Sequence, residues 1–100
     1  MNLVPLKLLT IVAESVLAEQ LTTELKALGA TGYTLTDARG QGSRHLRAGE
    51  QPSENVKIES VVSETVAQRT LEHLSKNYFP NYAILAYVAE VHTVRGEKYV

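Results

Sequence analysis

Two strand-helix-strand units in 100 residues most strongly limit what this chain can fold into. In the first unit, the apolar run at residues 6–13 predicts a buried strand, whose start we expect Pro5 to fix. Ser15 then suits a helix N-cap, Gly29 suits the position after the helix, and residues 32–37 alternate like a half-buried strand. The helical stripe between them consists of Leu17, Leu21, Leu25 and Leu28.

The second unit repeats this order. Residues 56–62 alternate like a third strand, and residues 65–68 have the spacing of a capping box that begins at Thr65. The second helical stripe consists of Ala67, Leu71, Leu74 and Tyr78. The helix is expected to stop near Pro80, and residues 82–92 form a last strand. Because this run is apolar on both faces, we expect it at the centre of the sheet.

The order β-α-β-loop-β-α-β predicts an α+β, ferredoxin-like βαββαβ domain over residues 1–100. In this fold a four-stranded antiparallel sheet carries two helices on one face. The other face then lacks cover, and we expect Ile84, Tyr87 and Val88 to place apolar surface there. Self-association through that face is therefore expected.

Residues 38–55, between the second and third strands, lack any helical or strand period and contain three arginines within nine positions. Glycines let backbone N–H groups approach an anion, and hydroxyl and guanidinium groups donate to phosphate oxygens. The predicted phosphate ligands are Gly40, Gly42, Ser43, Arg44 and Arg47. The alternative is a solvated loop whose charges only aid solubility.

Composition excludes several function classes. A net charge of −1 argues against a nucleic-acid binder, and the absence of cysteine excludes disulfides, thiolate nucleophiles and Cys-type metal sites. The three histidines have no ligand spacing, so no metal site is predicted. We find no signal peptide and no apolar run of membrane-spanning length, which favours a cytoplasmic protein.

Four segments carry a resemblance to PII-type signalling proteins that spans nearly the whole chain. They are Gly29-Ala30-Thr31-Gly32-Tyr33-Thr34, Gly40-Gln41-Gly42-Ser43-Arg44-His45-Leu46-Arg47, Gly49-Glu50-Gln51-Pro52 and Tyr78-Phe79-Pro80-Asn81-Tyr82-Ala83. Within that family the chain resembles most the SbtB group, which regulates the cyanobacterial sodium-dependent bicarbonate transporter SbtA. The loop at 38–55 corresponds to the flexible T-loop of the family.

The resemblance implies a non-enzymatic homotrimer that binds cyclic AMP, AMP, ADP or ATP between subunits and docks on a membrane transporter through its T-loop. By motif, Gly42, Ser43, Arg44 and Arg47 would hold the phosphates. The backbone around Tyr82, Ala83 and Ile84 would border the adenine. Whether Ca²⁺ or Mg²⁺ accompanies ATP stays open, and no prosthetic group is implied.

The chain departs from the SbtB group in two places. Gln41 stands where relatives often carry lysine, and the tail at 95–100 lacks their cysteine-flanked ending, so redox control is not carried over. The alternatives are a carboxysome-associated adenylate and bicarbonate sensor, a ferredoxin-like domain for another small molecule, or a nucleotide hydrolase. Two other functions of this fold are excluded. Residues 13–16 lack the phosphate-binding loop that an acylphosphatase needs, and residues 56–62 lack the aromatic side chains of an RNA-recognition module.

Overall fold

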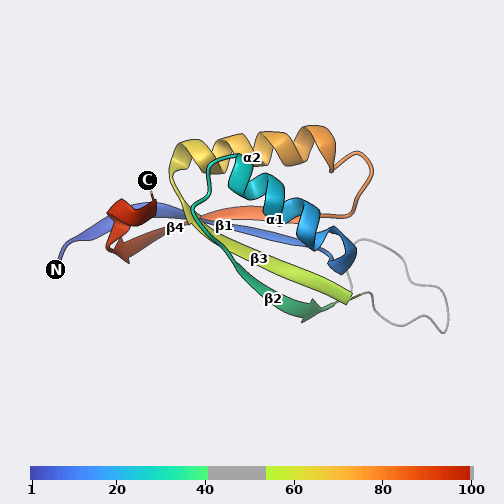
Figure 1. Cartoon of the computed structure of the whole chain (residues 1–100), viewed down its shortest axis with the longest axis horizontal. Helices are drawn as coiled ribbons and strands as arrows, with labels where there is room; N and C mark the ends of the chain where they lie inside the picture. The colour runs from blue at the N-terminus through green and yellow to red at the C-terminus, as the bar shows by residue number, and fades with distance from the viewer. Residues whose placement is uncertain (41–53, 100) are drawn as a thin grey trace.

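The computed structural model describes residues 1–40 and 54–99 and confirms the predicted ferredoxin-like fold (Figure 1). Both helices cover one face of a single antiparallel sheet with strand order β2-β3-β1-β4. Its elements are β1 (Leu3–Glu14), η1 (Ser15–Leu17), α1 (Ala18–Ala27), β2 (Thr34–Arg39), β3 (Glu54–Val62), α2 (Glu64–Asn77), β4 (Leu85–Val94) and η2 (Gly96–Tyr99).

Pro5 does not fix the start of β1, which begins two residues earlier at Leu3 and pairs Pro5 with His92 of β4. The pairing of β1 with β3 begins only at Lys7, so among the strands of residues 1–40 and 54–99 β4 alone pairs with β1 at Pro5. Proline has no N–H to donate and is tolerated where one side of a strand is unpaired. The residue predicted to begin the strand is therefore accommodated inside it.

The expectation of a central last strand is wrong: among the four described strands β4 pairs only with β1, at the edge of the sheet. Ile84, Ala86 and Val88 pack against the helix-side core, whereas Tyr87 lies on the opposite, open face and is 47% exposed. Only Tyr87 of the three residues expected on the uncovered face is found there. The last strand is apolar on both faces because one face packs against the core and the other carries exposed apolar side chains.

The core lies between the sheet and the helices. It contains Leu17 from η1, Leu21 and Leu25 from α1, and Ala67 and Leu74 from α2. These side chains meet the inward residues of the two central strands, which are Leu9, Ile11, Ala13, Val56, Ile58 and Val62. Leu28, the last member of the predicted stripe, is only half-buried. The helical period therefore predicted the buried face of α1 up to its final turn.

Three helix boundaries test the predicted caps. Ser15 caps neither helix, because it begins the short helix η1 and no side chain caps that helix or α1. The N-cap of α2 is Ser63 rather than Thr65, and its hydroxyl accepts from the Val66 N–H at 3.2 Å. Gly29 ends α1 as predicted: it donates to the Lys26 carbonyl while Ala30 donates to the Leu25 carbonyl, the Schellman pattern.

The second strand is shifted by two residues from the predicted range 32–37, because it begins at Thr34, and the third strand begins two residues earlier than predicted. β2 runs to Arg39 and β3 begins at Glu54, so residues 38, 39, 54 and 55 belong to the sheet rather than to the loop. The tail turns back after β4, and η2 places Gly96 against Val4 of β1. Figure 1 shows both chain ends at one end of the sheet.

Candidate functional site

A pocket of about 290 Å³ lies at the end of the sheet opposite the chain termini. Its lining comes from the end of β1, from η1 and from the connection between α2 and β4. The residues are Glu14, Leu17, Asn81, Tyr82 and Ala83. Tyr82 is 45% exposed, so an aromatic face remains available beside the opening. A half-exposed tyrosine beside a cavity is suited to pack against a planar ring.

The wall at residues 81–83 is shaped by hydrogen bonds that follow the end of α2. The carbonyl of Tyr78 accepts from the backbone N–H groups of Asn81 at 3.0 Å and Tyr82 at 2.8 Å. The Ile84 N–H then donates to the Tyr82 carbonyl at 3.1 Å, and the Ile84 side chain packs against the core. The pocket is lined by Tyr82 and Ala83, while Ile84 anchors the following strand.

Strand register connects this pocket to the start of the arginine-rich segment. Glu14 pairs with Asn55 of β3, and Asn55 pairs with Ala38 of β2. Two strand spacings of about 4.8 Å place the backbones of Glu14 and Ala38 about 10 Å apart. Gly40 follows β2 directly, at the same end of the sheet (Figure 1). A Cβ atom added there would meet nothing within 4 Å in the part of the chain that the structure describes.

The predicted site residues divide into two groups. Tyr82 and Ala83 lie together in the pocket, and Gly40 lies at the end of β2. The predicted phosphate ligands Gly42, Ser43, Arg44 and Arg47 lie outside the described residues. Sequence reasoning did not find Glu14, Leu17 or Asn81 as pocket residues. Leu17 matched the core stripe, and no motif marks the end of β1 as a site.

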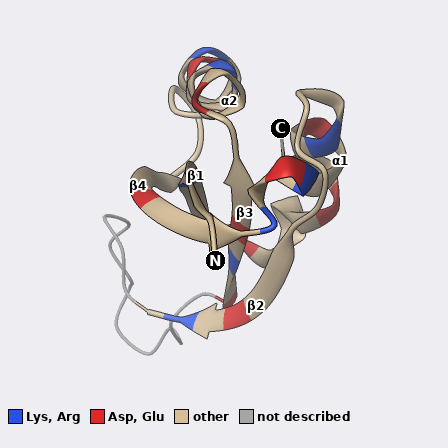
Figure 2. Ribbon diagram, turned by 90° about the vertical axis from the view of Figure 1, so that its left-hand side faces the viewer, with Lys and Arg blue, Asp and Glu red and all other residues tan. Residues whose placement is uncertain are grey.

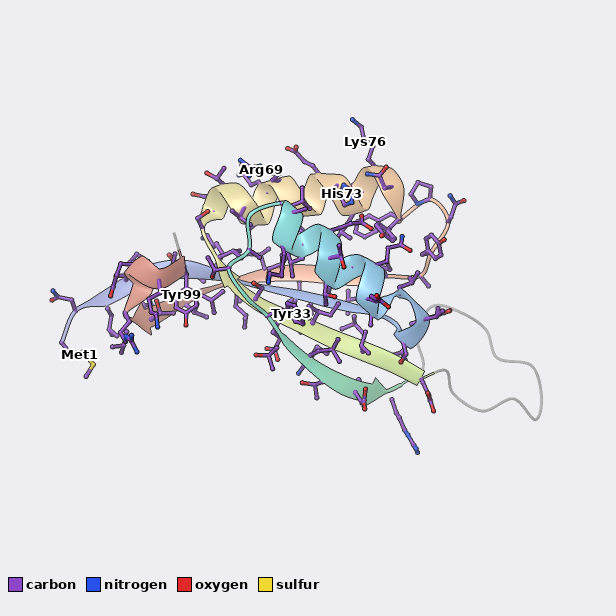
Figure 3. All side chains as sticks on the ribbon, viewed as in Figure 1. Met1, Tyr33, Arg69, His73, Lys76 and Tyr99 are labelled. Carbon is purple, nitrogen blue, oxygen red and sulfur yellow. The ribbon has the colours of Figure 1, made fainter. Side chains whose placement is uncertain are left out.

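Next to the wall, Tyr78 and Glu24 form a hydrogen-bonded pair between the two helices. Gln20 Nε2 donates to the Tyr78 hydroxyl at 2.6 Å, and this hydroxyl donates to Glu24 Oε2 at 2.5 Å. The other oxygen of Glu24 contacts His73 Nε2. Figure 3 shows His73 on the side of α2 that faces α1, whereas Lys76 points away from the sheet.

This pairing shifts the pKa values of Tyr78 and Glu24 in opposite directions. Burial raises the pKa of Tyr78, and the hydrogen bond to Glu24 raises it further, to about 12. Burial alone would raise the pKa of Glu24, but hydrogen bonds from Tyr78 and His73 outweigh it, so its pKa is lowered. At neutral pH the pair therefore consists of a neutral tyrosine that donates to an ionised glutamate.

Charged side chains do not gather into a metal centre in residues 1–40 and 54–99, where no group of three His, Asp or Glu could hold an ion. Of the carboxylates that flank the loop, Asp37 lies on β2 and Glu54 lies on β3. Figure 2 shows acidic and basic residues interspersed along the ribbons of both helices. No helix of the described chain is long and apolar enough to cross a membrane.

The family pattern that matches this chain and three similar solved structures all belong to PII or PII-like proteins. The sequence pattern of the family described as nitrogen regulatory protein P-II matches residues 6–98. A PII-like signalling protein from Thermus thermophilus shares 57% identity over 100% of both chains, with a TM-score of 0.87. CPII from Thiomonas intermedia, in a structure bound to ADP, AMP and acetate, shares 26% identity, with a TM-score of 0.86.

The CPII match covers 99% of this chain and 98% of the relative. A second structure of that protein, bound to ADP and bicarbonate, matches with a TM-score of 0.85 at the same identity and coverage. The family pattern extends from β1 through η2 and includes the pocket residues. The chain belongs to the P-II family of nitrogen regulatory proteins.

Proposed function

We propose that this protein is a non-enzymatic regulator that senses adenine nucleotides: cyclic AMP, AMP, ADP and ATP. The observation that carries this proposal is the pocket formed by residues 81–83 and the end of β1 in a chain whose full-length relative CPII binds ADP and AMP. Tyr82 and Ala83 would border the adenine. Gly42, Ser43, Arg44 and Arg47 would hold the phosphates, with Gly40 starting the loop that carries them.

The register of the sheet supports this division of roles. Because about 10 Å separates the backbones of Glu14 and Ala38, a base beside Tyr82 and phosphates beyond β2 lie within the reach of one nucleotide. PII-like proteins typically form trimers, and we propose a homotrimer here. The nucleotide would then lie between subunits and contact both the pocket and a neighbouring chain.

Regulation follows if the nucleotide favours one state of the loop that carries Arg44 and Arg47. A ligand shifts a conformational equilibrium only by the difference in its affinity for the two states. Cyclic AMP and ATP can therefore share a pocket and give different outputs. We propose that the output is docking on the bicarbonate transporter SbtA, which would bring a cytoplasmic protein to the membrane surface.

A second candidate function is an adenylate and bicarbonate sensor, as in carboxysome-associated PII-like proteins. The observation that favours it is that CPII binds ADP together with bicarbonate. Titration of ADP with and without bicarbonate separates the two candidates. A bicarbonate-dependent change in ADP affinity favours the second, and no change favours the transporter regulator.

Calorimetry with cyclic AMP, AMP, ADP and ATP tests the common part of both proposals. Arg44→Ala and Arg47→Ala each remove a charged donor, which costs about 1.5–3 kcal/mol, so we expect affinity to fall by about tenfold or more. Lys76→Ala, which removes a positive charge on the outer side of α2, is the control and is expected to bind normally. A wild-type protein that binds none of the four nucleotides would refute the proposal.

Phosphate release from ATP tests the proposed absence of catalysis. At an ATP concentration that saturates the calorimetric titration, a sensor is expected to release no phosphate above the protein-free rate. Sustained turnover that Arg44→Ala abolishes would instead identify a nucleotide hydrolase.

A further inference from the structure

Tyr78 joins the helical layer to the pocket wall. It follows the last residue of α2 and is only 2% exposed, although it lies between a helix end and an open connection. Its hydroxyl lies between Gln20 and Glu24, which are 58 and 54 residues away in sequence. Its carbonyl accepts the N–H groups of Asn81 and Tyr82. One residue is thus held by α1 and itself holds two of the five pocket-lining residues.

The side-chain end of this connection leaves the Tyr78 ring little freedom. Asn77 Nδ2 lies 3.1 Å from His73 Nδ1, and His73 Nε2 contacts the ionised carboxylate of Glu24, which only accepts, so Nε2 is the donor in that contact. Glu24 therefore receives one donor on each oxygen and keeps its charge. A charged acceptor makes the hydrogen bond from Tyr78 stronger than one between neutral groups.

The backbone end of the connection is equally direct. The Tyr78 N–H donates to the Leu74 carbonyl at 2.9 Å, which continues the hydrogen-bond ladder of α2. The rings of Tyr78 and Tyr82 also contact each other, with centroids 5.6 Å apart and planes tilted by 48°. A shift of the Tyr78 ring would therefore move the pocket wall through a ring contact and two backbone hydrogen bonds.

We infer that Tyr78 is a positioning residue for the nucleotide pocket: fixed to α1 by Gln20 and Glu24, it sets the place of the wall at residues 81–83. The part of this inference that concerns ligand affinity rests on the proposed nucleotide function. Tyr78 itself touches no ligand in this scheme, because its ring is enclosed between the helices and the sheet. A core residue that only joined α1 to α2 would stabilise the fold without setting the wall.

Amide hydrogen exchange without nucleotide separates these two roles. Tyr78→Phe keeps the ring and removes the hydroxyl, and we expect the Asn81 and Tyr82 amides to exchange about tenfold faster. The matched control is Thr70→Val, which removes a different buried hydroxyl, one within α2 that donates to the Val66 carbonyl at 2.8 Å. It is expected to leave those two amides unchanged relative to a core amide such as Ile11. Equal acceleration in both variants, or none in Tyr78→Phe, overturns the inference.

A second variant tests the same inference in case Tyr78→Phe does not fold. Gln20→Met removes the donor to the Tyr78 hydroxyl from an exposed position, and a several-fold acceleration at the same two amides is expected. If Tyr78→Phe does not fold, exchange in Gln20→Met decides the question alone. Unchanged exchange there then overturns the inference.

Titration with ADP tests the consequence for binding. Tyr78→Phe is expected to bind ADP at least about fivefold more weakly than the wild type, and Thr70→Val is expected to bind it normally. If the wild type binds ADP and Tyr78→Phe binds it equally well, the inference is overturned while the proposed function stands. If the wild type does not bind ADP, the proposed function fails, and amide exchange still decides whether Tyr78 positions the wall.

Discussion

Gly29 ends α1 with a φ of 121°, in the region that residues with a side chain rarely adopt. A Cβ atom added there would lie 3.0 Å from Val66 Cγ2. We expect Gly29→Ala to lower the free energy of unfolding by about 1–3 kcal/mol, measured by urea denaturation. Gly32→Ala is the control, because no described atom lies within 4 Å of its added Cβ and it is expected to be nearly neutral. Equal losses in the two variants would contradict this account.

Glu24 gives the protein a pH-dependent contribution to stability. Its pKa is lowered in the folded state, so folding favours the ionised form, and the contribution is present above the ordinary glutamate pKa of 4.5. It is lost as the pH falls through the lower folded pKa. The difference in melting temperature between wild type and Glu24→Gln should therefore be largest at neutral pH and shrink below about pH 4. A difference that stays constant down to about pH 2 would rule out this linkage.

Single residues differ in how far the sequence predicted them. Gly29 was predicted because the Schellman pattern places a glycine just past a leucine stripe, a local rule. The partners of Tyr78 lie 54 and 58 residues away, and no periodicity connects such distant positions. The histidine spacing predicted no metal role for His73, and no local rule predicts its contact with Glu24, which is 49 residues away. Local rules therefore found the backbone positions but not the pocket's supporting network.

At the scale of elements, the start of α2 separates the predicted cap from the observed one. Ser63 accepts from the Val66 N–H, and its replacement by alanine should lower the free energy of unfolding by roughly 0.5–2 kcal/mol. Thr65 lies inside α2 and is exposed, so Thr65→Ala should change it by a few tenths of a kcal/mol at most. Chemical denaturation of both variants measures this. A larger loss for Thr65→Ala would restore the predicted capping box.

The elements themselves followed from hydrophobic period, and their placement in the sheet did not. All four strands and both helices were predicted in the right order, because each buries one face against the other layer. β4 was misplaced because a strand with two apolar faces is typical of the centre of a sheet. An edge strand has the same pattern when one face packs against the core and the open face is also apolar. Only the pairing of β1 with both β3 and β4 distinguishes them.

At the scale of the whole molecule, the open face of the sheet has an apolar half. Leu85 and Tyr87 of β4 are 58% and 47% exposed, and Leu85 is paired with Val12 of β1. We expect the wild type to have the mass of a trimer by light scattering, and Tyr87→Lys to shift it toward the monomer because a charge would be buried. Gln68→Lys, on the exposed side of α2, is the control and should remain trimeric. A trimeric Tyr87→Lys would exclude this face from the interface.

The chain ends provide attachment points remote from the pocket. Both lie at one end of the sheet, and η2 packs Gly96 against Val4 close to the start of β1. The twelve residues of β1 separate that end from Glu14 by about 36 Å. A surface tether joined to either end should therefore leave the pocket free to bind ligand.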